Sequence, residues 1–258
     1  MGLFSKKFCD VCGEKIGLLG NRKLEDGNLC KNCAAKLSPW FSERRSSTVA
    51  QIKEQLAYRE ENKNAVAAFH TTKSFGDRTK ILLDEDAKKF MVTSARNLAE
   101  ANPDVLDYSQ VTGCDLDIDE HQNEEMREVR NADGTTKKVS YYPRRFTFSY
   151  DFKIKLRVNT PYFDEMNFDL NGSDVEISGV RTESPNQVLR MANPEYKHYY
   201  QMGEEIRQAL TEVRDTIREE INEAARPKEK VICPYCGAST IPDANGCCEY
   251  CGAALTGR

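Results

Sequence analysis

The amino-acid sequence predicts an α+β protein with an antiparallel, β-rich central domain that is capped by a long C-terminal helix and flanked by two small zinc-binding segments. Three observations predict this class. Four C-x-x-C pairs lie near the two ends of the chain, a hydrophobic period of two covers residues 70–177, and a helical period follows residue 193. Consecutive strands followed by one amphipathic helix favour a curved sheet or an open barrel with a helical cap.

The 258 residues suit one middle-sized domain with small modules attached, because each cysteine-rich segment is too short to bury a core without a metal. We therefore expect five consecutive parts. They are a four-cysteine zinc domain at 1–37, a helical connector at 38–69, a β-rich domain at 70–192, a long amphipathic helix at 193–226 and a zinc ribbon at 227–258.

Eight of the ten cysteines form the four C-x-x-C pairs, and these eight are the predicted metal ligands. A C-x-x-C turn places two thiolates on one side of a tight loop, and a second such turn completes the tetrahedral shell of zinc. We expect two zinc ions per chain, one held by Cys9, Cys12, Cys30 and Cys33 and the other by Cys233, Cys236, Cys248 and Cys251. A glycine, which readily adopts positive φ, follows three of the pairs and an alanine follows the fourth, at Gly13, Gly237, Gly252 and Ala34.

Cys247 lies directly before Cys248 and competes with it as a ligand. If Cys248 is the ligand, "CPYCG" and "CEYCG" share Cys, Tyr, Cys and Gly in register, and both pairs keep a two-residue gap. A three-residue gap, which Cys247 would give, also occurs among zinc ligands. The local symmetry favours Cys248, and the sequence leaves open whether Cys247 can replace it.

Both zinc sites are predicted to be structural, because four thiolates fill the coordination shell, whereas catalytic zinc keeps an open position. A redox role for C-x-x-C is typical beside a βαβ pattern, and no such pattern flanks these pairs. The start MGLFSKKFCDVC has no signal-peptide core, and no eighteen consecutive residues are apolar. We therefore expect a cytoplasmic protein with reduced thiols.

The elements between the zinc segments follow from residue spacing. Val49, Ile52 and Leu56 predict a helix that begins at Ser46, Ser47 or Thr48 and breaks near Asn62. "TKILLDEDAKKFMV" predicts a hairpin, and the alternation of "VTGCDLDI" and "FTFSYDFKIKLRV" predicts strands with one wet face. Asp133-Gly134 and Asn171-Gly172 are turn signals for hairpins around the last of these strands.

A long helix is expected to begin at Asn193 and Pro194 and to end at Arg226-Pro227. Its apolar residues recur every three or four positions, at Tyr199, Met202, Ile206, Leu210, Val213, Ile217 and Ile221. Because this stripe is longer than a small sheet, we expect its end to outrun the sheet.

"CDVCGEKIGLLGNRKLEDGNLCKNCAAKLSPWF" resembles the bacterial family called domain of unknown function 4428, over about the first 65 residues. The shared features are the two cysteine pairs, the glycine-rich centre and the L-S-P-[FW] exit, and they imply a zinc domain without implying an activity. "CPYCG" and "CEYCG" resemble the knuckles of short bacterial zinc ribbons. "NPDVLDYSQVTGCDL" resembles a loop and strand of bacterial pleckstrin-homology-like domains, which implies a β-rich domain with a helical cap and contact with a membrane surface.

Other polar groups have simpler explanations than a site. Asp115, Asp117 and Asp119 begin like a calcium loop, but Glu120 stands where the loop needs glycine, so a solvated strand face is favoured. Cys114 reads as a small buried hydrophobe. A basic cluster near the predicted turns has the residue types that contact phosphates or lipid headgroups, although most such clusters are only solvated; its members are Lys137, Lys138, Arg144 and Arg145.

No residue pattern nominates a catalytic site, because the three histidines are scattered and have no nucleophile beside them. The net charge of −4 argues against a protein that mainly coats nucleic acid. We expect a non-enzymatic zinc-binding adaptor that binds a protein partner, with peripheral membrane contact and self-association through residues 206–221 as further options. The alternative is a nucleic-acid-binding zinc-ribbon protein.

Overall fold

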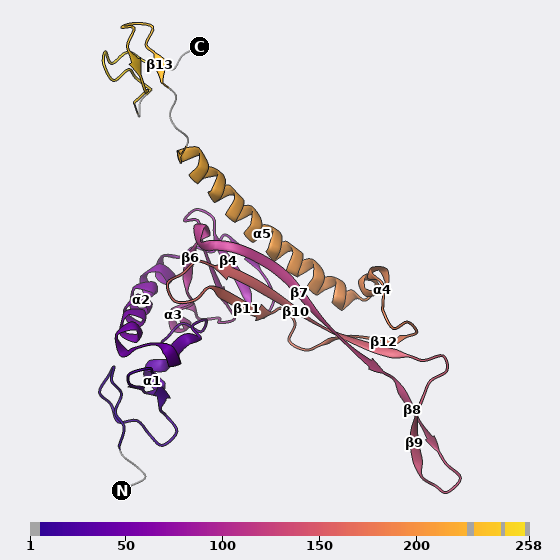
Figure 1. The fold of residues 1–258 in the computed structure, drawn as a ribbon. Helices are drawn as coiled ribbons and strands as arrows, with labels where there is room; N and C mark the ends of the chain where they lie inside the picture. The colour runs from indigo at the N-terminus through magenta and orange to yellow at the C-terminus, as the bar shows by residue number, and fades with distance from the viewer. Residues whose placement is uncertain (1–5, 226–229, 244–245, 256–258) are drawn as a thin grey trace. The chain divides into compact units, whose positions relative to one another are not determined.

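The structure is a computed structural model that describes residues 6–225, 230–243 and 246–255. The chain divides into two compact units, Met1–Arg214 and Asp215–Arg258. Residues 1–5 of the expected first zinc domain and the expected helix end at Arg226-Pro227 lie outside the described residues, as do residues 244–245 and 256–258 of the expected zinc ribbon. Figure 1 shows the order of the elements along the chain.

The first unit begins with a small cysteine-rich module that shares its core with the following helix. Strands β1 (Arg22–Lys23) and β2 (Asn28–Leu29) form a hairpin, and the one-turn helix α1 (Lys31–Ala34) and the 3₁₀ helix η1 (Glu43–Ser46) follow. Leu24, Leu29 and Leu37 are buried in one cluster with Ile52 of helix α2 (Val49–Ala68). The module therefore completes its core with a side chain from outside the cysteine-rich segment.

Helix α2 begins where the sequence predicts and continues past the predicted break. Thr48 is the N-cap, and its hydroxyl accepts a hydrogen bond from the backbone N–H of Gln51, which caps Thr48 in return. The helix runs without interruption through Asn62 to Ala68, so the predicted break is wrong. The reason is tertiary: the buried Asn62 amide donates to Pro103 O and accepts from Val105 N, at 2.8 and 3.0 Å.

A four-stranded antiparallel sheet follows α2. Its strands are β3 (Lys73–Phe75), β4 (Lys80–Asp84), β5 (Lys89–Thr93) and β6 (Val105–Asp107), paired in sequence order, and helix α3 (Leu98–Ala101) precedes β6. The predicted hairpin is β4–β5, whose turn is held by buried Asp84, which accepts hydrogen bonds from the backbone N–H groups of His70 and Ala87. Leu82 and Met91 pack with Val66 of α2.

The second sheet is built on two long strands that pair along their whole length. They are β7 (Val111–Glu124) and β10 (Phe146–Val158), and the short 3₁₀ helix η2 (Tyr108–Gln110) precedes the first. The alternation predicted for β10 appears as burial, because Phe152, Ile154 and Leu156 are fully buried while Lys155 and Arg157 are exposed. Beyond β7 and β10, the chain forms a separate hairpin of β8 (Met126–Arg130) and β9 (Thr136–Ser140) around the predicted Asp133-Gly134 turn.

Asn171-Gly172 does not form the hairpin that the sequence predicts. Strands β11 (Glu165–Asp169) and β12 (Val175–Val180) run in the same direction and pair with successive parts of the same edge of β10. Between them, the buried Asn171 side chain accepts from Phe152 N at 2.8 Å and donates to Tyr150 O at 3.1 Å. The amide thus replaces the backbone pairing that is missing where one strand ends and the next begins.

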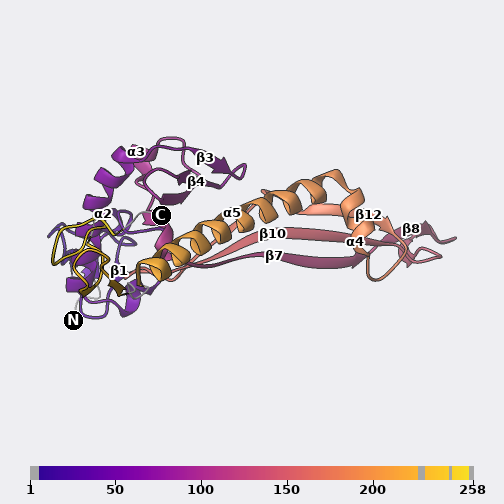
Figure 2. The same ribbon diagram turned by 90° about the horizontal axis from the view of Figure 1, so that it is seen from above.

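Helix α5 (Pro194–Ala225) follows the short helix α4 (Gln187–Ala192), and its part within the first unit, up to Arg214, covers the apolar face of the second sheet (Figures 1 and 2). Tyr196, which the predicted stripe omitted, is 2% exposed and packs edge-on against the rings of Tyr150 and Phe152. Gly203 lies against Leu116 of β7, and a Cβ at this position would come within 2.5 Å of a Leu116 methyl group. A larger residue here would therefore displace the Leu116 side chain.

The second unit contains a small zinc-ribbon-like segment with one short hairpin, β13 (Val231–Ile232) and β14 (Ser239–Thr240). Over the described residues, every strand pair is antiparallel and no sheet closes into a barrel. The predicted fold class is confirmed, with the central strands divided between two sheets. None of the helices in the described part of the chain has the length and apolar character needed to cross a bilayer.

Candidate metal centres

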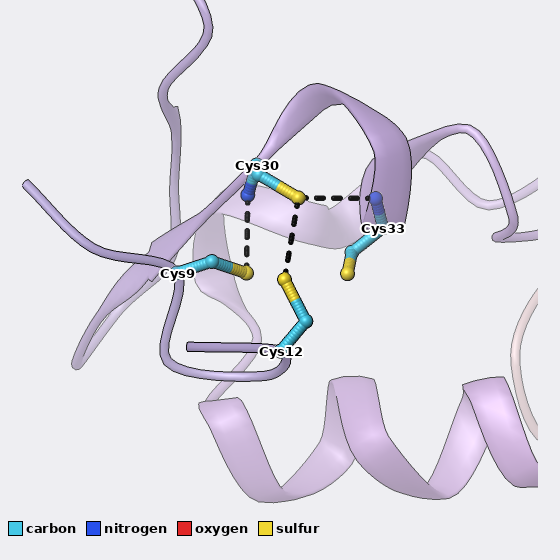
Figure 3. Close-up of side chains that lie close together, drawn as sticks. All are labelled: Cys9, Cys12, Cys30 and Cys33. Carbon is cyan, nitrogen blue, oxygen red and sulfur yellow. Dashed lines mark hydrogen bonds between the residues drawn. The ribbon is translucent and has the colours of Figure 1, made fainter. Parts of the chain in front are cut away.

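The first metal centre is formed by the two N-terminal C-x-x-C pairs. The Sγ atoms of Cys9, Cys12, Cys30 and Cys33 all lie within 4.8 Å of one another, and Figure 3 shows that they point toward a common centre. Three of the four side chains are buried and Cys12 is exposed. The hairpin β1–β2 joins the pairs, so its short connection brings residues about twenty positions apart to one point.

Cys9 and Cys12 lie on a tight backbone knuckle. The backbone N–H of Cys9 donates to Glu14 O at 2.9 Å, and the N–H of Gly13 donates to Cys9 O at 2.8 Å. Gly13 has a φ of 75°, in the left-handed region that glycine adopts without strain. The glycine therefore turns the chain so that both sulfurs remain on the same side.

Cys30 and Cys33 are placed differently, at the start of helix α1. Cys30 is the N-cap, and its sulfur accepts from the backbone N–H of Cys33 at 3.3 Å. Cys30 N in turn donates to the sulfur of Cys9 at 3.3 Å. Because the chain enters a helical turn here, with Ala34 N donating to Cys30 O, no positive φ is needed after Cys33. This explains why alanine stands where the other three pairs have glycine.

The second metal centre consists of two knuckles like that of Cys9. The Sγ atoms of Cys233, Cys236, Cys248 and Cys251 lie within 4.8 Å of one another. Gly237 N donates to Cys233 O and Gly252 N donates to Cys248 O, both at 2.8 Å. The two glycines have φ values of 71° and 70°. The backbone thus repeats the same turn at both pairs.

Cys247 lies outside the second group of sulfurs because of its place in this repeated turn. In each knuckle, the residue before the first cysteine pairs with the residue seven positions later, as Phe8 does with Lys15, Ile232 with Ser239 and Cys247 with Ala254. Cys247 therefore occupies the position of an isoleucine in the neighbouring knuckle. Its backbone N–H also donates to the Asp243 carboxylate at 2.8 Å. The assignment of Cys248 as the ligand remains a prediction that this geometry supports.

The sulfur separations test whether zinc fits. Four sulfurs at about 2.3 Å from one zinc ion lie about 3.8 Å apart, along the edges of a tetrahedron. The observed separations include 3.7 Å for Cys12–Cys30, 3.6 Å for Cys233–Cys251 and 3.7 Å for Cys236–Cys248. A disulfide would need about 2.05 Å. The two clusters are suitable for binding two zinc ions, and the tetrathiolate donor set fits a structural metal.

Comparison with known protein families gives a match at the first metal centre. The family described as Domain of unknown function (DUF4428) matches residues 7–55. The match spans the first metal centre and the start of helix α2, and we call this matched part the DUF4428 module. This match covers about a fifth of the chain and leaves the sheets, helix α5 and the second metal centre unassigned. No curated protein and no solved structure matches the chain.

The DUF4428 centre has unequal thiols before metal binds. Burial raises the pKa of Cys9, but hydrogen bonds from the backbone N–H groups of Cys12, Cys30 and Val11 together outweigh burial and lower the pKa to about 6. Burial raises the pKa of Cys33 well above the usual range, and the neighbouring sulfurs raise it again. At neutral pH the thiolate of Cys9 is thus favoured over that of Cys33, so binding of zinc releases a proton from Cys33.

The second centre shows the same inequality. Burial raises the pKa of Cys233, and backbone N–H groups of Cys236 and Tyr235 lower it to about 7. The pKa of Cys251 is lowered by a backbone hydrogen bond from Ala253 but raised more by burial and by the neighbouring thiols, to about 12. The pKa of Cys233 therefore lies below that of Cys251, and a metal ion that binds both displaces a proton from Cys251.

Cys114 and the three aspartates of the calcium-like stretch do not gather into a site. Burial raises the pKa of Cys114 to about 12, which suits a packed side chain under helix α5 and not a nucleophile. The three aspartates of the calcium-like stretch lie on β7, where they pair with cations of β10: Asp115 with Arg157, Asp117 with Lys155 and Asp119 with Lys153, at 2.6–2.7 Å. Their carboxylates are already neutralised by these cations.

A cavity of about 400 Å³ opens beside α4 and α5 and was not anticipated from the sequence. Its walls include Tyr150, Tyr196 and Tyr200, and an ion pair between Arg190 and Glu120 at 2.8 Å crosses it. The Arg190 guanidinium also lies 5.8 Å from the centre of the Tyr150 ring. The chain therefore partly fills this cavity with its own cation.

A buried ion pair that the sequence did not reveal joins the DUF4428 module to the first sheet. Arg59 of α2 donates to the Asp104 carboxylate at 2.7 Å, and the two side chains are 6% and 0% exposed. Ser38 donates to the same carboxylate at 2.7 Å, and Arg59 also donates to Lys36 O and Asn102 O. Ser38 and Lys36 follow the last cysteine of the first centre closely, so the metal module is tied to the sheet through α2.

Proposed function

We propose that this chain is a non-enzymatic, zinc-stabilised adaptor of the cytoplasm whose long helix binds a protein partner. The tetrathiolate character of both centres supports a structural role for the metal, because four sulfurs leave no position at which a substrate or water could bind. When bound, zinc crosslinks segments that are too short to form a stable hydrophobic core by themselves. The cysteines orient the knuckles, and the rest of the protein provides the binding surface.

The observation that carries this proposal is the changing exposure of the apolar stripe on helix α5. Ile206 and Leu210 are fully buried, Val213 and Ile217 are half-buried, and Ile221 is 58% exposed. The apolar residues keep their helical spacing, while their exposed fraction increases toward the C-terminal end of the helix. An exposed apolar strip of this kind marks a surface for another protein, and an amphipathic helix is the partner that fits it.

The experiment replaces the uncovered part of the stripe. Ile217→Ser with Ile221→Ser is expected to abolish capture of a partner or self-association while the protein still binds two zinc ions. Glu219→Ser with Glu223→Ser is the matched control, since these exposed residues lie on the opposite side of the same helix. Affinity capture with mass spectrometry and light scattering measure the two forms of association. Equal profiles for both double variants and the unchanged protein would refute the proposal.

The resemblance of the β-rich part to pleckstrin-homology-like domains stays a prediction, as does the membrane contact that it implies. The order of four strands, a long hairpin with its edge strands and a final helix supports the resemblance. Co-sedimentation of the zinc-loaded protein with anionic vesicles tests the contact.

A further inference from the structure

The hairpin β8–β9 and its flanking segment form an arm that extends the long β7–β10 pair. We call residues 126–145 the basic arm. Figures 1 and 2 both show β8–β9 projecting beyond β12 and α4, and β8 and β9 pair only with each other among the described strands. Most of its side chains are exposed, none is buried, and Tyr142 is 100% exposed. Both faces of the arm are therefore open to a partner.

The basic arm differs in charge from the rest of the chain. It contains six Lys or Arg residues and two Asp or Glu residues, for a net charge of +4. Because the whole chain carries −4, the remaining residues carry −8. The whole-chain charge, which argues against nucleic-acid binding, is thus an average over two regions of opposite sign.

Four of the six cations of the arm also differ from those of the neighbouring strands in having no partner in the described part of the chain, whereas Arg144 lies 3.7 Å from Glu124. Among the described residues, no ion pair or side-chain hydrogen bond is formed by Arg127, Arg130, Lys137 or Lys138, although Glu128 lies opposite Lys138 in the strand register. On β10, by contrast, Lys153, Lys155 and Arg157 are each paired with an aspartate of β7. The sheet therefore neutralises its cations with aspartates, whereas these four cations of the arm have no carboxylate partner among the residues that the structure describes.

The strand register distributes these four cations over both faces of the arm. Arg127 lies opposite Val139 and Lys137 opposite Val129, so both cations share one face. Arg130 lies opposite Thr136 and Lys138 opposite Glu128, on the other face. A flat surface can reach only one face at a time. A groove with phosphates along both walls can reach both.

We propose that the basic arm binds duplex DNA by entering the major groove. The major groove, about 12 Å wide, admits a two-stranded β-ribbon, and its walls carry the phosphates that four unpaired cations would neutralise. The tip of the arm, Ala132-Asp133-Gly134, is small and acidic, which opposes insertion into a bilayer. This inference goes beyond the adaptor role of helix α5 and does not depend on it.

Fluorescence anisotropy of the zinc-loaded full chain with a labelled duplex tests the proposal. Four neutralised phosphates give a log–log salt slope of about −3.6, which is a loss of about 150-fold in affinity between about 50 and 200 mM salt. Lys137→Ala with Lys138→Ala is expected to reduce the slope to about −1.8 and the loss to about 12-fold. Lys153→Ala with Lys155→Ala removes the same charge from paired positions and is expected to leave slope and affinity near those of the unchanged protein.

Three results would overturn the proposal. The first is the absence of salt-sensitive binding at the lower salt concentration. The second is an equal loss for the arm variant and the matched β10 variant, which would assign binding to net charge alone. The third is tighter binding to phosphatidylserine vesicles or to a polyglutamate peptide than to the duplex, which would make the arm a membrane or acidic-protein site. Circular dichroism and zinc content of both variants exclude misfolding as a cause.

Discussion

Replacing Asp104 by alanine tests the joint between the DUF4428 module and the first sheet. The change leaves the buried Arg59 guanidinium without its carboxylate and the Ser38 hydroxyl without its acceptor. Removing one partner of a buried ion pair costs about 3–5 kcal/mol, and a lost hydroxyl bond adds about 1 kcal/mol. Arg59 keeps its bonds to Lys36 O and Asn102 O, which offsets part of this cost. We therefore expect the free energy of unfolding to fall by about 3–5 kcal/mol.

Urea unfolding followed by the fluorescence of Trp40 measures this loss locally. Trp40 is the single tryptophan, and its backbone N–H donates to the Ser38 hydroxyl at 3.2 Å, so it reports on the joint. With a slope of about 2 kcal/mol per M, the midpoint should move down by about 2 M. Glu60→Ala is the matched control, because the Glu60–Lys63 pair on the same helix is exposed and contributes less than about 1 kcal/mol.

A second substitution separates an unpaired charge from a lost contact. Adding Arg59→Met to Asp104→Ala removes the uncompensated guanidinium and should recover about 1–3 kcal/mol. The reasoning is wrong if Asp104→Ala shifts the unfolding midpoint no more than Glu60→Ala does. It is also wrong if adding Arg59→Met lowers the free energy of unfolding further instead of raising it.

Three further predictions concern the metal centres and the first sheet. Elemental analysis should give two zinc ions per chain, and chelation should increase proteolysis of both cysteine-rich segments while the β-rich part keeps its circular dichroism. Cys247→Ser should keep two zinc ions whereas Cys248→Ser loses one, and the reverse result would show that the ligand assignment is wrong. Asp84→Ala should lower the free energy of unfolding by about 1.5–3 kcal/mol at neutral pH, since backbone N–H groups bond its carboxylate and lower its pKa. This contribution is present above about pH 4 and is lost as pH falls through the lowered folded-state pKa, so a pH-independent difference in unfolding midpoints would contradict it.

The parts of the fold that could be predicted depend on neighbours in sequence. Strand β10 alternates apolar and polar side chains over its whole length because one face is buried under α5, and the period alone therefore predicts it. The knuckles are equally local, since cysteine spacing and the following glycine determine where the two sulfurs lie. The helical start of α1 is also local, and alanine in place of glycine after Cys33 is the sequence signal that this pair differs from the others.

The errors arose where a side chain serves a distant segment. Intrinsic preference predicts a helix break at Asn62 and a hairpin turn at Asn171, because asparagine is weak in helices and common in turns. Both amides instead bond backbone groups far along the chain, at the loop before β6 and on β10. The Arg59–Asp104 pair was missed for the same reason, since 45 positions separate its members and neither belongs to a periodic pattern.

The distribution of charge shows most clearly why tertiary pairing matters for the candidate partners. The sequence does not distinguish the two lysines of the arm from those of the sheet, because all four read as solvated cations on or near strands. They are Lys137 and Lys138 of the arm and Lys153 and Lys155 of the sheet. Pairing of β7 with β10 supplies aspartates to the second pair and leaves the first pair without any. Net charge counts all four equally, whereas a phosphate gains most from the two that no carboxylate already holds. The strand register, and not the composition, therefore decides which lysines are available to bind an anion.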